Sequence, residues 1–261
     1  MPRTIVMGEM PFDEIGDAIK AGYINVVVPA GSIEAHGPHL PTTTDNIMAT
    51  FIGKRVAEII GHTLVAPVIP LGPTEPMRNF PGTISLRPTV FVDILVDYCR
   101  ALSNIGIRNI FILSYHGGNY PQIKDAVPHL SQQFPNLNVI GLVGPFMGYR
   151  EARNEILKMH GITPDEGGNH AGAAETSDML YVSPDMVRME KAEKGLVDPR
   201  AADIYAIPLA MARGFDKVSS VGVSGDPTKA SREIGKEVNK ALVNYFATEC
   251  KKALESLTNQ S

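Results

Sequence analysis

The sequence lacks tryptophan, and it has only two cysteines, Cys99 and Cys250. Each cysteine lies in a stretch with helical spacing of apolar residues and neither belongs to a CxxC pair, which argues against a disulfide framework and a thiolate metal site. No apolar run reaches the ~18 residues that a membrane-spanning helix needs, and the first residues do not have the pattern of a secretory signal. We therefore expect a cytoplasmic protein that makes no membrane contact.

The sequence also lacks a surplus of basic residues. Its 24 lysines and arginines are interspersed with 28 aspartates and glutamates, which gives a formal net charge of −4. No positive field is available to attract a phosphate backbone, so nucleic acid is not an expected partner. Hydrophobic residues make up 44% of the chain, enough for a large core. We expect one domain, residues 1–261, that acts on a small molecule.

Short runs rich in valine and isoleucine alternate with longer segments of helical spacing, which is typical of parallel strands joined by helices. The expected strands are Ile24–Pro29, Leu64–Ile69, Asn109–Ser114 and Leu137–Val143. The expected helices are Thr44–Ile60, Thr89–Ile105, Pro121–Phe134, Ala173–Tyr181 and Thr228–Leu257, whereas Ser183–Gly225 shows no clear period. Because the strand runs are apolar on both faces, the pattern predicts a single-domain three-layer α/β/α fold around a central, mostly parallel sheet.

Acidic residues and histidines follow two of the expected strands. Glu34, His36 and Asp45 follow the first, and His116 and Asn119 follow Asn109–Ser114. Ligands of open α/β sheets bind beyond the carboxyl ends of the strands, and carboxylates and imidazoles are the usual ligands of zinc, manganese and iron. Neither loop has the glycine pattern that cradles phosphates. The two loops therefore predict a site for divalent metal.

The spacing within the first loop suggests a two-metal site. Glu34 and His36 are two residues apart, so in an extended segment their side chains point the same way. The two oxygens of one carboxylate can bridge adjacent ions, and Asp45 is our choice for that bridge. The alternative is that Asp45 only caps the helix that begins beside it, the better explanation for an isolated aspartate.

A third cluster joins His170 to Glu175 at the start of an expected helix. Helix capping would explain Glu175, because a carboxylate is favoured near a helix N-terminus, but it does not explain His170 in a glycine-flanked loop. For His39, a structural role is as plausible as metal binding. The remaining histidines stand alone and are interpreted as solvated or bonded to backbone: His62, His129 and His160.

Five motifs in the same order together resemble the creatininase family of amidohydrolases. They are GSIEAHGPHLPTTTD, FPGTISL, SYHGGN, HAGAAETS and GVSGDPTKA. Five motifs in register are far more specific than any one alone. The resemblance spans about residues 7–240.

This resemblance implies a two-metal hydrolase that cleaves a carbon–nitrogen bond in a small cyclic amide or formamide, commonly as a homohexamer. Zinc is the first choice of metal, with manganese or iron as alternatives. By position, one ion would be held by Glu34, Asp45 and His116, and the other by His36, Asp45 and a glutamate. In creatininase that glutamate follows the counterpart of His116 by two residues, where this chain has Gly118.

Glu175 is therefore expected to complete the second metal site, as in relatives with the His-Gly-Gly-Asn motif, and His170 matches the family's proposed catalytic proton donor or acceptor. Creatininase closes its pocket with tryptophans, and many relatives have histidine where this chain has Met77. Creatinine is therefore a doubtful substrate. The candidate substrate contacts are Ser32, Glu75, Arg78, Tyr115 and Asn119.

Two other functions remain open. The first is hydrolytic opening of an oxidised inositol ring. One relative in the family hydrolyses a carbon–carbon bond in this way, so the metal motif does not fix the bond type. The second is that of a non-catalytic metal-binding protein. Retention of every expected ligand and of His170 argues against loss of catalysis.

Overall fold

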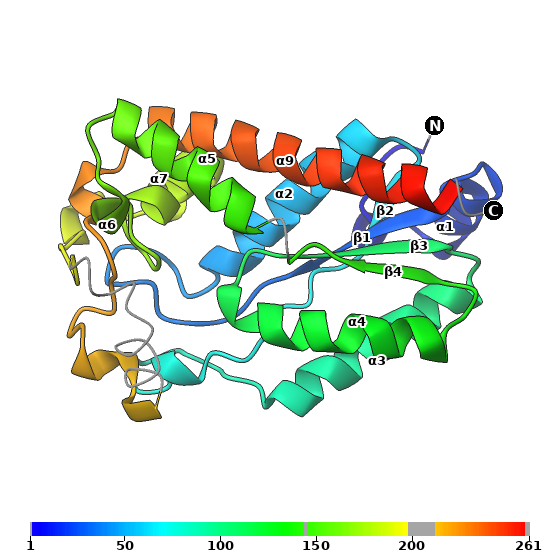
Figure 1. The fold of residues 1–261 in the computed structure, drawn as a ribbon, viewed down its shortest axis with the longest axis horizontal. Helices are drawn as coiled ribbons and strands as arrows, with labels where there is room; N and C mark the ends of the chain where they lie inside the picture. Colours follow the sequence, from blue (N-terminus) through cyan, green and yellow to red (C-terminus); the bar gives the residue numbers. More distant parts are fainter. Residues whose placement is uncertain (1, 144–145, 198–211, 259–261) are drawn as a thin grey trace.

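The computed structural model of the chain describes residues 2–143, 146–197 and 212–258. Over these residues the strands form one four-stranded parallel sheet in the order β2-β1-β3-β4 (Figure 1). The strands are β1 (Asn25–Ala30), β2 (Thr63–Val65), β3 (Asn109–Ser114) and β4 (Asn138–Gly141). The predicted central parallel sheet is therefore confirmed.

Helices cover both faces of this sheet (Figure 1). Val26 and Ile110 point to one face and pack with α1 (Phe12–Lys20), α3 (Pro88–Asn104) and α4 (Tyr120–Gln133). Val27 and Phe111 point to the other face, in a core that includes α2 (Thr44–Ile60), α5 (Phe146–Met159), α7 (Ala173–Val182) and α9 (Arg232–Thr258). The side chains of successive strand residues thus point to opposite faces of the sheet and contribute to two separate cores. This arrangement confirms the predicted three-layer α/β/α fold.

Short helices lie in the connections. One is α6 (Pro164–Gly167), whose residue before the first turn, Thr163, forms a reciprocal capping box with Glu166. The 3₁₀ turns are η1 (Met7–Glu9), η2 (Glu75–Met77), η3 (Gly117–Asn119), η4 (Pro184–Met186), η5 (Met189–Lys191), η7 (Phe215–Lys217) and η8 (Pro227–Lys229). Of these turns, η2 lies in the connection that follows β2, and η3 follows β3 directly.

Some element boundaries differ from the expected ones. β2 ends at Val65 rather than at Ile69 because the regular pairing with β1 is interrupted by one extra residue: Ala66 donates to Val27, but Ile69 and not residue 68 donates to Pro29. Ile69 still bridges to Ala30. The C-terminal helix begins at Arg232 because the 3₁₀ turn η8 precedes it. Helices α1 and α5 were not expected. Within the segment without a clear period, residues 198–211 lie outside the described residues.

The register of the sheet places the loops that carry the candidate ligands side by side. Ala30, the last residue of β1, pairs with Ser114, the last residue of β3. At the opposite end, the side-chain amide of Asn109 donates to Asn25 at 2.7 Å, and that of Asn138 donates to Asn109 at 2.7 Å. Because this ladder joins three strands in register, their carboxyl ends open at the same edge of the sheet.

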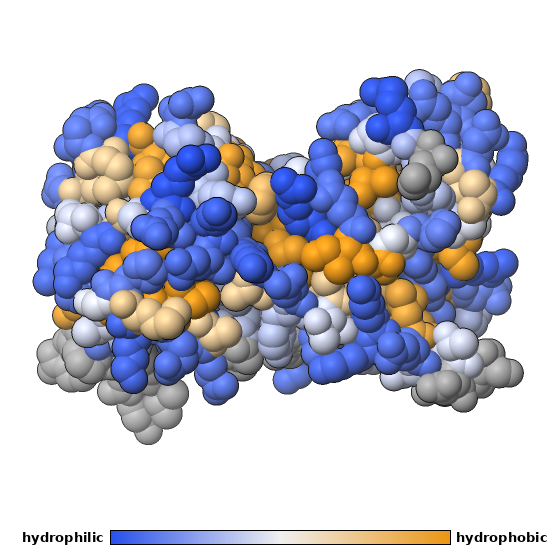
Figure 2. Space-filling view, turned by 90° about the horizontal axis from the view of Figure 1, so that it is seen from above, coloured by the Kyte–Doolittle hydropathy of each residue, from blue (hydrophilic) through white to orange (hydrophobic). Residues whose placement is uncertain are grey.

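No helix in the described part of the chain combines the length and apolar character needed to cross a membrane. Seen from the side of α5 and α9, the surface is mostly hydrophilic (Figure 2). A band of apolar residues lies in the hollow between its two raised ends.

Candidate metal centre

Three separate segments bring the candidate ligands to the carboxyl edge of the sheet. Glu34 and His36 lie in the loop after β1, Asp45 is the second residue of α2, and His116 follows β3. All four side chains are buried, with 1–8% of each residue exposed to solvent. Burying charged and polar groups without partners is costly, so these side chains must satisfy one another or an ion.

Asp45 lies between two imidazoles. Its Oδ1 is 3.3 Å from Nε2 of His36, and its Oδ2 is 3.1 Å from Nδ1 of His116. The hydroxyl of Ser32 donates to Oδ2 at 2.7 Å. The first turn of α2, which lies wholly within the described residues, has no side-chain cap hydrogen bond. The contacts of Asp45 are therefore those of a residue at the centre of a cluster and not those of a helix cap.

Glu34 faces three histidines with one oxygen. Its Oε1 is 3.3 Å from Nδ1 of His116, 3.8 Å from Nε2 of His36 and 3.6 Å from Nδ1 of His170. Its other oxygen, Oε2, accepts a hydrogen bond from the hydroxyl of Thr74. The carboxylate is thereby held with Oε1 at the centre of the cluster.

Each of these histidines has its second ring nitrogen against a backbone carbonyl. Nδ1 of His36 is 3.1 Å from the carbonyl oxygen of Glu34, Nε2 of His116 is 2.9 Å from that of Pro73, and Nε2 of His170 is 2.7 Å from that of Ala35. A carbonyl only accepts, so these nitrogens carry the protons. The opposite nitrogens are left to face the carboxylates, which is how metal-binding histidines are oriented in proteins.

His170 and Glu175 lie on the more open side of the cluster. Their side chains are 16% and 18% exposed, compared with 1–9% for the other four candidate residues. Oε2 of Glu175 is 3.8 Å from Nε2 of His36 and accepts a 2.6 Å hydrogen bond from the backbone N–H of Ala171. Ala171 has a positive φ of 52°, a strained conformation for a residue with a side chain.

The donor atoms fit a divalent ion. Among the described residues, two sets of three have donor atoms within 4.8 Å of one another: Glu34, Asp45 and His116, and Glu34, His36 and His170. The first set agrees with the predicted ligands of one ion. The second contains Glu34 and His170 where Asp45 and Glu175 were predicted, so Glu34 is common to both sets and His170 competes with Glu175 for the same role. The assignment of Glu175 as a ligand stays a prediction.

The charges of the cluster also suit a cation. Burial by itself would lower the pKa of His36, but the nearby carboxylates, Asp45 first, raise it to about 10. Burial acts in the same direction on His116, and Glu34 and Asp45 raise its pKa well above the usual range. Burial would raise the pKa of Asp45, but the two histidines hold it well below the ordinary value. The carboxylates thus remain charged and favour positive charge between them.

The predicted substrate contacts fall into two groups. Ser32 and Asn119 are fully buried; the amide of Asn119 donates to the carbonyl of Gly31 at 3.0 Å and to Oγ of Ser114 at 3.1 Å. The hydroxyl of Tyr115 donates to Oδ2 of Asp178 at 2.7 Å. Glu75 and Arg78 lie together at η2, where their side chains form an ion pair of 3.5 Å. Contact between any of these residues and a substrate stays a prediction.

Sequence reasoning missed several residues that support the site. Asp178 lies one turn after Glu175 on α7, and this three-residue spacing was a signal that could have found it. Thr74 precedes a residue that was singled out, but nothing in the sequence indicates its bond to Glu34. His39, left open between two roles, lies 2.8 Å from Oγ1 of Thr176 through Nε2, and burial lowers its pKa to about 4.

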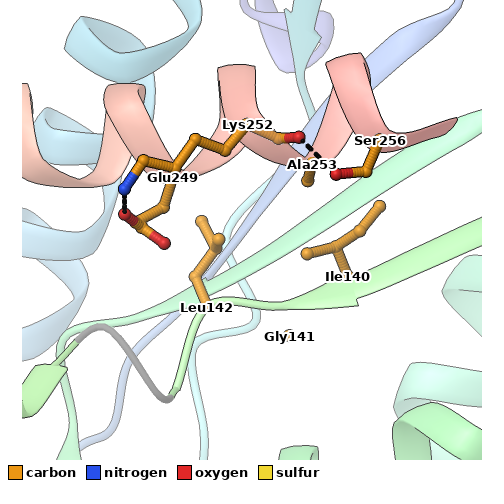
Figure 3. A pocket seen from close by; sticks show the side chains of 7 residues that line it. All are labelled: Ile140, Gly141, Leu142, Glu249, Lys252, Ala253 and Ser256. Carbon is orange, nitrogen blue, oxygen red and sulfur yellow. Dashed lines mark hydrogen bonds and ion pairs between the residues drawn. The ribbon is translucent and has the colours of Figure 1, made fainter. Parts of the chain in front are cut away.

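A separate depression lies between β4 and the C-terminal part of α9 (Figure 3). Its lining includes Glu249 and Lys252, which form an ion pair of 2.8 Å with each other. The remaining lining residues are Ile140, Gly141, Leu142, Ala253 and Ser256, and none of the candidate metal ligands is among them. This depression is therefore separate from the candidate metal centre beyond β1 and β3.

The structure is a parallel α/β/α sandwich with buried carboxylates and histidines at the carboxyl edge of its sheet, an arrangement suited to a metal-dependent enzyme. The family model of creatininase, described as creatinine amidohydrolase, matches residues 8–250. The chain belongs to the creatininase family.

Similar proteins support this assignment. The mycofactocin precursor peptide peptidase of Mycolicibacterium smegmatis is 31% identical over 87% of this chain and 84% of that protein. The creatinine amidohydrolase of Pseudomonas putida is 25% identical over 95% of this chain and 96% of that protein. A solved creatininase mutant of the Zn-Zn type superposes with a TM-score of 0.80 at 25% identity, covering 96% of this chain and 98% of the other. The chain is thus a hydrolytic enzyme, as predicted.

Proposed function

We propose that this enzyme hydrolyses the carbon–nitrogen bond of a small amide at a centre of two divalent metal ions, zinc being the first choice and manganese or iron the alternatives. The observation that carries the proposal is the position of Asp45, whose two oxygens face the ring nitrogens of His36 and His116 that lie away from the backbone carbonyls. A carboxylate placed in this way can serve both ions of a two-metal site.

In this proposal, Glu34, Asp45 and His116 hold one ion, and His36, Asp45 and Glu175 hold the other. The ions would polarise the substrate carbonyl and bring the pKa of water near neutrality. The buried residues around them exclude bulk water, which strengthens every electrostatic interaction within the site.

His170 would move the proton to the leaving nitrogen. Its Nε2 proton is held by the carbonyl of Ala35, so Nδ1 is the atom that can accept and donate. Oε1 of Glu34, 3.6 Å away, stabilises the ring when Nδ1 is protonated. The side chain of His170 is 16% exposed, more than those of the buried ligand candidates, and a general acid and base must be within reach of the substrate.

The proposed substrate is a small cyclic amide or a formamide. A short peptide is the second candidate, because a relative at 31% identity is a peptidase. Hydrolytic opening of an oxidised inositol needs the same ions and stays the alternative with a different bond. This chain has no tryptophan, the residue type with which creatininase closes its pocket, so creatinine is not proposed as the substrate.

Elemental analysis followed by a substrate screen tests this proposal. Purified protein is expected to hold close to two divalent ions per chain and to release amine from at least one cyclic amide, formamide or short peptide. Activity should disappear with a chelator and return with added zinc or manganese. Protein that holds fewer than one ion per chain after zinc loading, or that hydrolyses only an oxidised inositol, would refute the amide proposal.

The family resemblance also predicts a homohexamer. Light scattering of the purified protein decides this point, because a hexamer of a 28.2 kDa chain differs in mass from every smaller assembly.

A further inference from the structure

The ring of Phe215 lies beside His170 at the open side of the metal centre. The centroids of the two rings are 6.0 Å apart, and their planes meet at 77°. His170 also lies against His36, with centroids 4.3 Å apart and planes tilted by 36°. The imidazole therefore contacts both a candidate ligand and a half-buried aromatic ring.

Two hydrogen bonds fix the start of the turn that carries Phe215. The side-chain amide of Asn79 donates to Oδ1 of Asp216 at 2.7 Å, and the guanidinium of Arg78 donates to the carbonyl of Ala212 at 3.2 Å. Gly214 adopts a φ of 100°, and a side chain there would meet the amide of Asn79. The turn η7 is therefore docked tightly on the segment that follows η2.

Residues 219–224, which follow the turn η7, are hydrogen-bonded to both Phe215 and His170. The backbone N–H of Ser219 donates to the carbonyl of Phe215 at 2.9 Å, and that of Ser224 donates to the carbonyl of His170 at 2.8 Å. The hydroxyl of Ser219 also donates to the carbonyl of Val223 at 2.8 Å. Phe215 and His170, which are far apart in the sequence, thus belong to one hydrogen-bonded unit.

Residues 73–79, on which the turn η7 is docked, also contact the candidate metal ligands directly. The carbonyl of Pro73 accepts from His116, and Thr74 donates to Glu34. Residues 73–79 therefore extend from two candidate ligands to Asp216. This connection fixes the position of the Phe215 ring relative to the candidate ligands Glu34 and His116.

We propose that Phe215 is a specificity-determining residue whose ring forms the apolar wall of the substrate pocket beside His170. It selects substrates that carry an apolar group next to the scissile amide, and Asn79 positions it through Asp216. An apolar group gains free energy by leaving water for this ring, and an aromatic group gains an additional edge-to-face contact. This inference rests on the proposed two-metal function.

Two metal-chelating probes test whether the ring of Phe215 forms this apolar wall, and the test does not require the substrate to be known. Acetohydroxamate and benzohydroxamate bind divalent metal through the same group but carry a methyl and a phenyl substituent, respectively. Zinc-loaded protein is titrated with each probe by calorimetry, and the ratio of the two affinities is compared between variants. This comparison cancels the intrinsic difference between the probes.

Phe215→Ala is expected to reduce the relative preference for benzohydroxamate by roughly three- to tenfold, the size of a lost aromatic pair. Phe215→Leu should lose less because it retains apolar area, and Asn79→Ala should lower the preference because the turn is freed. The affinity for acetohydroxamate and the zinc content should remain unchanged. Phe12→Ala is the matched control, since Phe12 is 89% exposed at the start of α1.

Other results would overturn the proposal. An unchanged preference in both Phe215 variants means that the ring does not contact the probe. An equal loss of affinity for both probes means that Phe215 only supports His170. Zinc analysis separates these outcomes from failure of the two-metal function, which would appear as wild-type protein without bound zinc, and thermal unfolding of Phe215→Leu confirms that the loss is not due to misfolding.

Discussion

Oδ2 of Asp45 accepts a 2.7 Å hydrogen bond from the hydroxyl of Ser32. This bond fixes the rotation of the carboxylate, so that one oxygen faces His36 and the other faces His116. Ser32 was predicted to touch the substrate, but its hydroxyl is engaged in this bond in the structure. We therefore expect it to act on the metal centre through Asp45.

Asp45→Ala is expected to lose both metal ions, because a bridging carboxylate serves both sites. Plasma mass spectrometry of the purified variant measures the metal content per chain. Asp97→Ala, which removes an exposed carboxylate on α3, is the matched control. If Asp45→Ala retains full occupancy, Asp45 is not the bridge.

His170→Ala should retain both ions but lose turnover by ~10²–10⁴-fold, the usual contribution of a general acid or base. Metal content and turnover on the best substrate of the screen are measured on the same sample. His160→Ala, which removes a surface histidine paired with Glu237, is expected to change neither. Loss of one ion from His170→Ala would instead make His170 a ligand, as its place beside Glu34 and His36 allows.

Glu175→Gln is expected to weaken one of the two metal-binding steps and to lower activity while the fold stays intact. The amide oxygen of glutamine can still accept from the N–H of Ala171, so only the charge near His36 is removed. Calorimetric titration of metal-free protein with zinc resolves the two steps, with Glu249→Gln on α9 as the control. If both metal-binding steps are unchanged, another group must complete the second metal site, and the candidates are His39, Glu75 and His170.

Asp178 is expected to make the protein less stable as pH rises. Burial, together with the charge of Glu175, raises the pKa of Asp178 to about 8, against the lowering effects of the bond from Tyr115 and of Arg153. The folded state then binds a proton that the unfolded state releases near pH 4, so the free energy of unfolding falls between about pH 4 and 8, by at most ~1.4 kcal/mol per pH unit. Above the folded-state pKa the loss is complete.

Asp178→Asn should remove this dependence, because an asparagine can accept from Asn239 and donate to the hydroxyl of Tyr115 without a charge. Urea unfolding of metal-free protein at pH 5 and pH 8 measures the difference. Asp97→Asn serves as the control, since its carboxylate is exposed. Equal pH dependence in wild type and Asp178→Asn would show that Asp178 is already ionised at pH 5.

The sequence by itself determined the fold class and most of the candidate ligands. The apolar runs of β1 and β3 and the helical spacing of Thr44–Ile60 are local patterns, and they predicted these elements to within one residue. Helix α5 was missed because glycine, proline and charged residues around it weaken its period. Glu34, His36, Asp45 and His116 could be singled out because ligand-type residues directly follow strands, which is a property of the chain and not of its packing.

Only the tertiary structure decided how these residues face one another. The register that pairs Ala30 with Ser114 brings His116 to Asp45, and the packing of α7 beside α2 brings His170 and Glu175 into competition for the place next to His36. The bonds from His116 to Pro73 and from Asn79 to Asp216, and the contact of Phe215 with His170, join segments that no local pattern relates. Such contacts depend on the direction in which each loop leaves the sheet, and that direction is set by packing on both faces at once.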